Sequence, residues 1–107
     1  MRRDAAPLAD MANSASRIMG ICRGLDLAAL SGDETRQAAV LHHIAVIGEA
    51  ASRISPELRV RHTAIPRADI VSQRNRVVHA YFGLDWSLLW KTISVGVPVL
   101  LAQVNAS

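Results

Sequence analysis

The residues best suited to chemistry lie close together in one segment, 74–81, which reads RNRVVHAY. On an α-helix, Asn75 and His79 are four residues apart and share a face, about 40° from each other. The five-residue step from Arg74 to His79 turns about 140° around the axis, so these two side chains flank the helix. They converge on one small anion only if the long arginine reaches around the helix, the helix distorts, or a second copy contributes. A two-fold dimer brings two such segments together and solves this geometry.

These side chains form a coherent chemical set. A histidine such as His79 has an ordinary pKa near ~6.5 and moves protons in either direction at neutral pH. Arg74 is always charged and holds phosphate through a fork of donors, while Asn75 can orient the histidine or a phosphate oxygen. Without nearby carboxylates, the pair suits metal-free attack by a ribose 2′-hydroxyl on its own 3′-phosphate, with arginine stabilising the phosphorane. Tyr81 could stack on a base, donate a hydrogen bond or be modified.

Two features decide how much weight this segment carries. Residues 53–76 hold six arginines and two acids, a local charge of +4 that leaves −1 on the rest of the chain. Such a patch suits a phosphate-bearing partner. The alternative is a solvated helix face in an arginine-rich chain, since eleven of the twelve basic residues are arginine. By spacing alone, the motif also fits a structural histidine, because an arginine and a histidine five residues apart recur by chance.

The length and composition indicate one small intracellular domain. A chain of 107 residues is expected to form a single domain, residues 1–107, with one core and little room for a deep cavity. The single cysteine, Cys22, excludes an intramolecular disulfide and a cysteine-based metal cluster. No signal-like apolar run follows the first residues, and the longest apolar stretch near the end, Val97–Ala102, is far shorter than a bilayer requires. We therefore expect a cytoplasmic protein with no membrane partner.

The spacing of apolar residues predicts an all-α fold, an up-down bundle of four helices. Asp4 is expected to cap the first helix, which ends near Gly24. Asp33 is expected to cap a second helix that ends near residues 55–56, followed by a polar connection over residues 55–65. The third helix is expected over about residues 66–82. The fourth starts at Asp85 and is bent or ended by Pro98.

Three further groups of residues have structural interpretations. His42 and His43 are about 100° apart on a helix and lack a completing ligand, so no metal site is predicted and they are assigned to the surface or an interface. Glu49 either pairs with an arginine of the third helix, with Arg74 as the candidate, or faces solvent. Trp86 and Trp90 share a helix face and are expected to pack, within the chain or across a dimer interface.

At the segment already singled out, the sequence resembles a known family. Arg74, His79 and Tyr81 match the Arg-X4-His-X-Tyr motif of the HEPN superfamily, specifically of HepT-like toxins. The resemblance extends from Asp4 to about Leu101. It includes the following segments: Ile47-Gly48-Glu49-Ala50-Ala51, Ile65-Pro66, Arg74-Asn75, Tyr81-Phe82-Gly83-Leu84-Asp85, Trp90 and Pro98-Val99-Leu100.

The resemblance implies a four- to five-helix bundle that forms a homodimer, with the two motifs facing a shared cleft. HepT-like proteins are ribonuclease toxins paired with an MNT-type nucleotidyltransferase antitoxin, which can add AMP to the motif tyrosine. Carried onto this chain, the resemblance makes Arg74 and His79 catalytic, Asn75 a supporting residue and Tyr81 the site of AMPylation. We expect no metal and no cofactor.

This chain departs from the family pattern at two positions: many relatives have a tryptophan where Arg67 stands, and Arg76 adds a further positive charge inside the motif. Arg67 either loosens the packing at the helix entrance or enlarges the basic patch. Together with Arg76, it is expected to bind RNA phosphates.

Two other functions remain open at this point. The chain could be a non-catalytic helical subunit that binds a nucleotidyltransferase partner or a nucleotide, in which case His79 would be unnecessary. It could also be a plain dimerisation bundle, which leaves the charge of residues 53–76 unexplained.

Overall fold

The computed structural model describes residues 2–61 and 86–106, and in both ranges the chain is helical. The first range contains α1 (Arg2–Ile21), α2 (Leu27–Ser31), α3 (Glu34–Ser52) and α4 (Pro56–Arg61). The second is one continuous helical run of α6 (Trp86–Lys91), the π-helical segment η2 (Thr92–Gly96) and α7 (Val97–Asn105). The all-α fold is thus confirmed, with two short helices, α2 and α4, that the spacing of apolar residues did not predict. The third predicted helix, over about residues 66–82, lies outside the described ranges.

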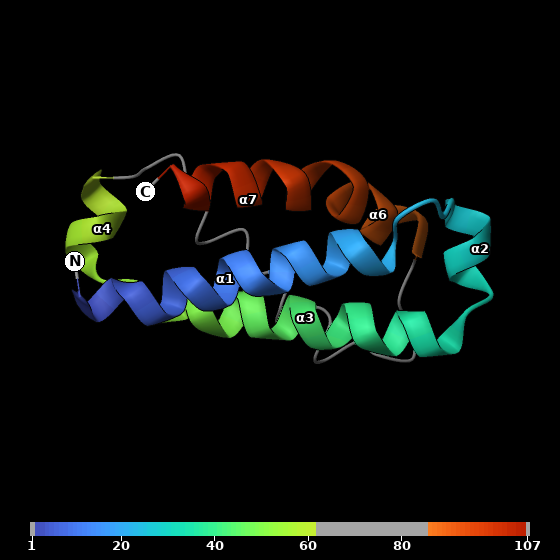
Figure 1. Cartoon of the computed structure of the whole chain (residues 1–107), viewed down its shortest axis with the longest axis horizontal. Coiled ribbons are helices and arrows are strands. Elements are labelled where there is room, and N and C mark those ends of the chain that lie inside the picture. The colour runs from blue at the N-terminus through green and yellow to red at the C-terminus, as the bar shows by residue number, and fades with distance from the viewer. Residues whose placement is uncertain (1, 62–85, 107) are drawn as a thin grey trace.

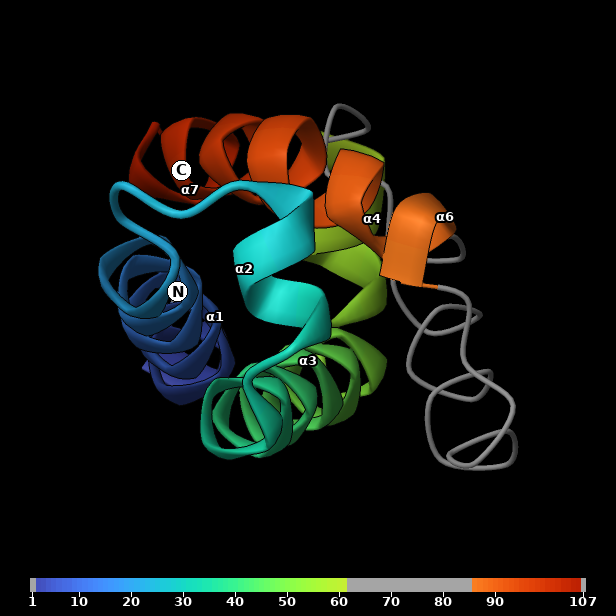
Figure 2. The same cartoon turned by 90° about the vertical axis from the view of Figure 1, so that its right-hand side faces the viewer.

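Three long helical segments lie side by side and form the bundle (Figure 1). α1 packs antiparallel to α3 along its length and against the C-terminal run on another side (Figures 1 and 2). α2 lies across one end of the bundle, and α4 lies at the other end (Figure 1). The seam between α1 and α3 is therefore the longest contact between two elements in the described part of the chain.

The apolar spacing of each helix explains this packing. Met11, Ala15 and Ile18 of α1 follow a three-and-four spacing and are fully buried. α3 and the C-terminal run add buried residues at the same spacing: Val40, Ile44, Ile47 and Ala51 from α3, and Leu89, Ile93, Val97, Leu100 and Val104 from the run. Met19 and Leu88 follow the apolar spacing of the same helices but are exposed.

Local capping signals set several helix boundaries. The Asp33 carboxylate accepts a hydrogen bond from the Arg36 backbone N–H at 3.0 Å, which confirms Asp33 as the N-cap of α3. Asp26 caps α2 in the same way through Ala29. Gly24 has a φ of 74°, the left-handed conformation that glycine adopts most easily, so the chain turns there as predicted.

Asp4 plays a different part from the predicted one. α1 begins before it, at Arg2, so Asp4 does not cap α1. Its buried carboxylate instead accepts hydrogen bonds from the Ser55 backbone N–H (2.8 Å) and the Ser55 hydroxyl (2.6 Å). The Ser55 hydroxyl oxygen in turn accepts a bond from the Leu58 N–H at 3.2 Å, so Ser55 caps α4. Residues 56–61 of the predicted polar connection are therefore helical.

The C-terminal run passes through Pro98 without ending. Val97 donates its N–H to the Thr92 carbonyl, five residues back, which makes a wide π turn directly before the proline. A proline inside a regular α-helix clashes with the carbonyl four residues before it, here that of Ser94. The wide turn relieves that clash, so Pro98 is accommodated rather than terminating the helix.

The same run, Trp86–Asn105, has the length and apolar composition of a membrane span. Core helices of globular proteins satisfy this test as well, and one face of the run packs into the bundle core. Trp86 and Trp90 are partly buried and contact that core, as predicted for their packing within the chain.

Candidate functional site

The residues that the sequence assigns to chemistry fall in the part of the chain that the structure does not describe. Arg74, Asn75, His79 and Tyr81 all lie in residues 62–85, as do the proposed phosphate-binding residues Arg67 and Arg76. Their roles therefore remain predictions from the sequence. The described residues that carry charge or titrate lie mainly along the α1–α3 seam and at its ends.

His43 and Ser14 form the central polar contact of this seam. Ser14 Oγ of α1 and His43 Nδ1 of α3 lie 3.0 Å apart and share a hydrogen bond, with the donor set by the histidine tautomer. Ser14 is buried and His43 is half-buried. Burial lowers the pKa of His43, and the charges of His42 and Arg17 lower it further. A neutral imidazole is therefore favoured at this seam.

His42 is exposed and His43 lies at the seam between two helices, and both positions agree with the predicted assignment to the surface or an interface. His42 is exposed, and its ring meets the His43 ring edge-to-face at a centroid distance of 5.0 Å. Within residues 2–61 and 86–106, no three His, Cys, Asp or Glu side chains gather as a metal site would require.

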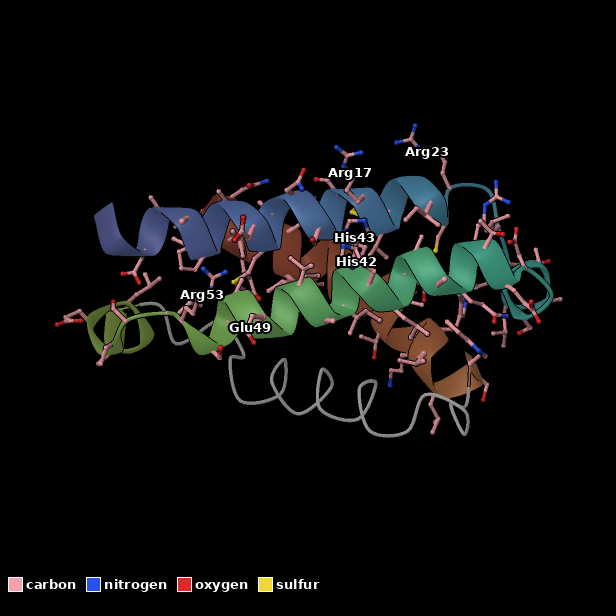
Figure 3. All side chains as sticks on the ribbon, turned by 90° about the horizontal axis from the view of Figure 1, so that it is seen from below. Arg17, Arg23, His42, His43, Glu49 and Arg53 are labelled. Carbon is pink, nitrogen blue, oxygen red and sulfur yellow. The ribbon has the colours of Figure 1, made fainter. Side chains whose placement is uncertain are left out.

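Four arginines of the described chain divide into two groups. Arg36 pairs with Asp33 (Nη1–Oδ2 2.6 Å) and Arg53 pairs with Asp10 (Nη2–Oδ2 3.0 Å). Arg17 and Arg23 extend outward from α1 and the turn after it (Figure 3), and neither makes an ion pair within the described part of the chain. Their charges are therefore not neutralised by a neighbouring carboxylate there.

Glu49 and Cys22 are two further titratable residues of the described chain. Glu49 is exposed on α3, which is the solvent-facing alternative of its two predictions. Its proposed partner Arg74 lies outside the described residues. Cys22 is half-buried, and burial raises the pKa of its thiol, so the reactive thiolate is disfavoured.

Comparison with known proteins supplies the identity that these contacts alone do not. The family model described as "Ribonuclease HepT-like" matches residues 11–107, which include all of the 74–81 segment. The chain belongs to the HepT-like ribonuclease family. It is thus a member of the HEPN superfamily and an RNA-cleaving enzyme, as the resemblance of its motif predicted.

Individual relatives of this HepT-like chain come from archaea and bacteria. A protein of Methanocaldococcus jannaschii named as a candidate RNase is 31% identical over 98 residues, which are 92% of this chain and 90% of that protein. A protein of Thermococcus cleftensis named as a probable ribonuclease HepT is 37% identical over 68 residues, 64% of this chain and 62% of the relative. A candidate RNase of Caldanaerobacter subterraneus is 29% identical over 83 residues, 78% and 74% of the two chains. No solved structure matches this chain.

The unpaired arginines Arg17 and Arg23 and the Ser14–His43 contact were not singled out from the sequence of this HepT-like protein. A signal for the arginines was present, because residues 11–25 contain both of them and no Asp or Glu. The Ser14–His43 contact joins residues 29 positions apart and depends on how α1 and α3 pack.

Proposed function

We propose that this ribonuclease is the toxin of a toxin–antitoxin pair and cleaves RNA without a metal, with Arg74 and His79 as its catalytic residues. The observation that carries the proposal is the family match over residues 11–107, which contains the complete Arg-X4-His-X-Tyr motif of this sequence. The paired antitoxin is an MNT-type nucleotidyltransferase, and the toxin acts in the cytoplasm as a homodimer whose two motifs face a shared cleft.

The proposed reaction is an internal transesterification of RNA. His79 accepts the proton of a ribose 2′-hydroxyl, whose oxygen attacks the adjacent 3′-phosphate. Arg74 stabilises the additional negative charge on the phosphorane, and Asn75 orients the histidine or a phosphate oxygen. The bond from phosphorus to the 5′-oxygen then breaks, and that oxygen takes up a proton. The products are a 2′,3′-cyclic phosphate and a fragment with a 5′-hydroxyl, so no metal-bound water is required.

Cleavage in the presence of EDTA tests this mechanism. The purified protein is expected to cleave RNA in EDTA, and His79→Ala and Arg74→Ala are each expected to reduce the rate by about 10²-fold or more. Arg36→Ala removes the same charge as Arg74→Ala at a surface ion pair and serves as the matched control, with a rate close to wild type. RNA with 2′-O-methyl groups should resist cleavage. Unchanged rates in both motif variants would refute the catalytic assignment, and binding of RNA without cleavage would identify a non-catalytic subunit.

We further propose that the antitoxin silences the enzyme by AMPylation of Tyr81. The tyrosine oxygen attacks the α-phosphorus of ATP, AMP is transferred and pyrophosphate leaves. The added phosphate places negative charge and bulk next to Arg74, where it competes with the RNA phosphate. Intact mass after incubation with the antitoxin and ATP should show added AMP on the wild type and none on Tyr81→Phe. An AMP adduct on Tyr81→Phe would contradict this assignment.

A further inference from the structure

We propose that the surface formed by Arg17, Arg23, His42 and His43, named here the α1–α3 cationic surface, binds phosphates of the RNA strand beyond the scissile one. The proposal rests on the RNA-cleaving activity and extends it, because none of these residues belongs to the Arg-X4-His-X-Tyr motif. Figure 3 shows the two arginines along the outer edge of α1 and the two histidines on α3 beside it.

The carboxylates of the α1–α3 pair lie toward its ends. Residues 11–25 contain Arg17 and Arg23 and no acid, and residues 35–48 of α3 contain both histidines and no acid. The acids of this part of the chain flank these stretches: Asp4, Asp10, Asp26, Asp33, Glu34 and Glu49. Because α1 and α3 lie side by side, the middle of their seam holds Arg17 and the two histidines and no carboxylate from either helix, and Arg23 follows at the C-terminal end of α1.

The arginines of this surface differ from Arg36 and Arg53 in whether a carboxylate pairs with them. Arg36 and Arg53 each form an ion pair, with Asp33 and Asp10 respectively. Arg17 and Arg23 are exposed and make no ion pair within the described part of the chain, so their guanidinium groups keep their donors available. Arginine is the side chain best suited to bind phosphate through paired donors. These two residues are therefore the ones we expect to contact RNA.

The pKa of the neighbouring His43 responds to the charge of Arg17. Burial is the main cause of the lowered pKa of His43, and the positive charges of His42 and Arg17 lower it further, so Arg17 lies close enough to act on this ring. The hydrogen bond with the Ser14 hydroxyl, which lies 3.0 Å from Nδ1, holds the His43 ring at the seam between α1 and α3. His42 lies exposed on the same seam and can approach a bound phosphate or ribose.

RNA binding by charge-matched variants tests the proposal. The full chain is titrated against a fluorescent single-stranded 2′-O-methyl RNA, which keeps its phosphates and lacks the attacking hydroxyl. Arg17→Gln/Arg23→Gln is compared with Arg36→Gln/Arg53→Gln, which removes the same net charge from arginines that are already paired. We expect the first variant to bind on the order of tenfold more weakly near 0.1 M salt, and its plot of log affinity against log salt to be shallower by about 1.4. The control is expected to stay within about twofold of wild type and to keep its salt slope.

The outcomes separate this proposal from the proposed catalytic mechanism. Equal losses in the two double variants would overturn the proposal, because they would indicate a response to overall charge. No loss in either variant, or no binding of RNA by the wild type, would overturn it as well. The catalytic assignment is judged independently, by whether His79→Ala and Arg74→Ala lose cleavage of ordinary RNA in EDTA, a measurement that does not involve Arg17 or Arg23. If Arg17→Gln/Arg23→Gln keeps its RNA affinity but no longer binds the antitoxin, the surface binds a protein and the proposal is wrong.

Discussion

The Ser14–His43 contact shows how one titratable side chain links the packing of two helices to pH. His43 is half-buried at the α1–α3 seam, and burial disfavours its charged form, so its pKa in the folded chain lies below the ordinary value of 6.5. The unfolded chain therefore binds the proton first as pH falls. Stability contributed by the neutral ring is complete above about pH 6.5 and is lost as pH decreases toward the folded-state pKa.

This linkage predicts a specific difference between two adjacent histidines. The melting temperature of the wild type should fall between pH 7.5 and pH 5.5, and His43→Gln should reduce that fall, because glutamine can bond Ser14 without titrating. His42→Gln, at the exposed neighbouring position, is the control: it removes one charge that lowers the pKa of His43 but leaves the burial of that ring, the larger cause, so most of the pH dependence of the wild type should remain. Thermal melts followed by circular dichroism give the comparison. Parallel curves for all three proteins would show that His43 does not carry the effect.

At the scale of elements, the bond network of Asp4 and Ser55 joins the start of α1 to the start of α4. Asp4→Ala leaves the buried Ser55 N–H without its carboxylate partner, and we expect it to lower the free energy of unfolding by about 2–4 kcal/mol. Asp10→Ala on the same helix breaks an exposed ion pair with Arg53 and should cost less than about 1 kcal/mol. Urea unfolding of the two variants measures the difference. Equal losses would mean that the buried network contributes no more than the surface pair.

The elements also show which parts of the fold the sequence can predict. Long helices with regular apolar spacing and local signals such as Asp33 and Gly24 were predicted, because the residues that determine them are close in sequence. α2 and α4 span only five and six residues, too few for a periodic pattern to emerge. The role of Asp4 was also missed, since its partner Ser55 is 51 residues away and only the tertiary packing brings them together.

For the candidate site, the sequence predicts the catalytic residues and the structure describes a different set of charged residues. The catalytic assignment of Arg74 and His79 comes from a motif of residue types at fixed spacing, and it remains a prediction because residues 62–85 are outside the described structure. Arg17 and Arg23 carry no motif, and their significance appears only once the ion pairs of Arg36 and Arg53 distinguish them from the paired arginines. The spacing of residue types along the sequence therefore predicts the catalytic residues, whereas the packing of the helices shows which arginines have no ion pair within the described part of the chain and can bind a ligand.

At the scale of the whole molecule, the decisive question is whether one copy of the chain completes an active site. The five-residue step between Arg74 and His79 places their side chains about 140° apart on an ideal helix, which favours a site that takes its arginine from one copy and its histidine from another. A site within one chain is the alternative, and it requires the arginine to reach around the helix or the helix to distort.

Mixing two inactive variants distinguishes these arrangements. Arg74→Ala and His79→Ala are unfolded together in equal amounts and refolded, so that about half of the dimers contain one copy of each variant. If the site is shared between copies, each mixed dimer has one intact site of two, and the mixture should recover about one quarter of the wild-type cleavage rate. If each copy supplies both residues to its own site, the mixture stays inactive, because every chain lacks one of them. The double variant Arg74→Ala/His79→Ala, refolded with an equal amount of wild type, is the control, and one quarter of its dimers are fully active wild type. The mixture should keep about one quarter of the wild-type rate if the site is shared between copies, and about one half if a single chain supplies both residues.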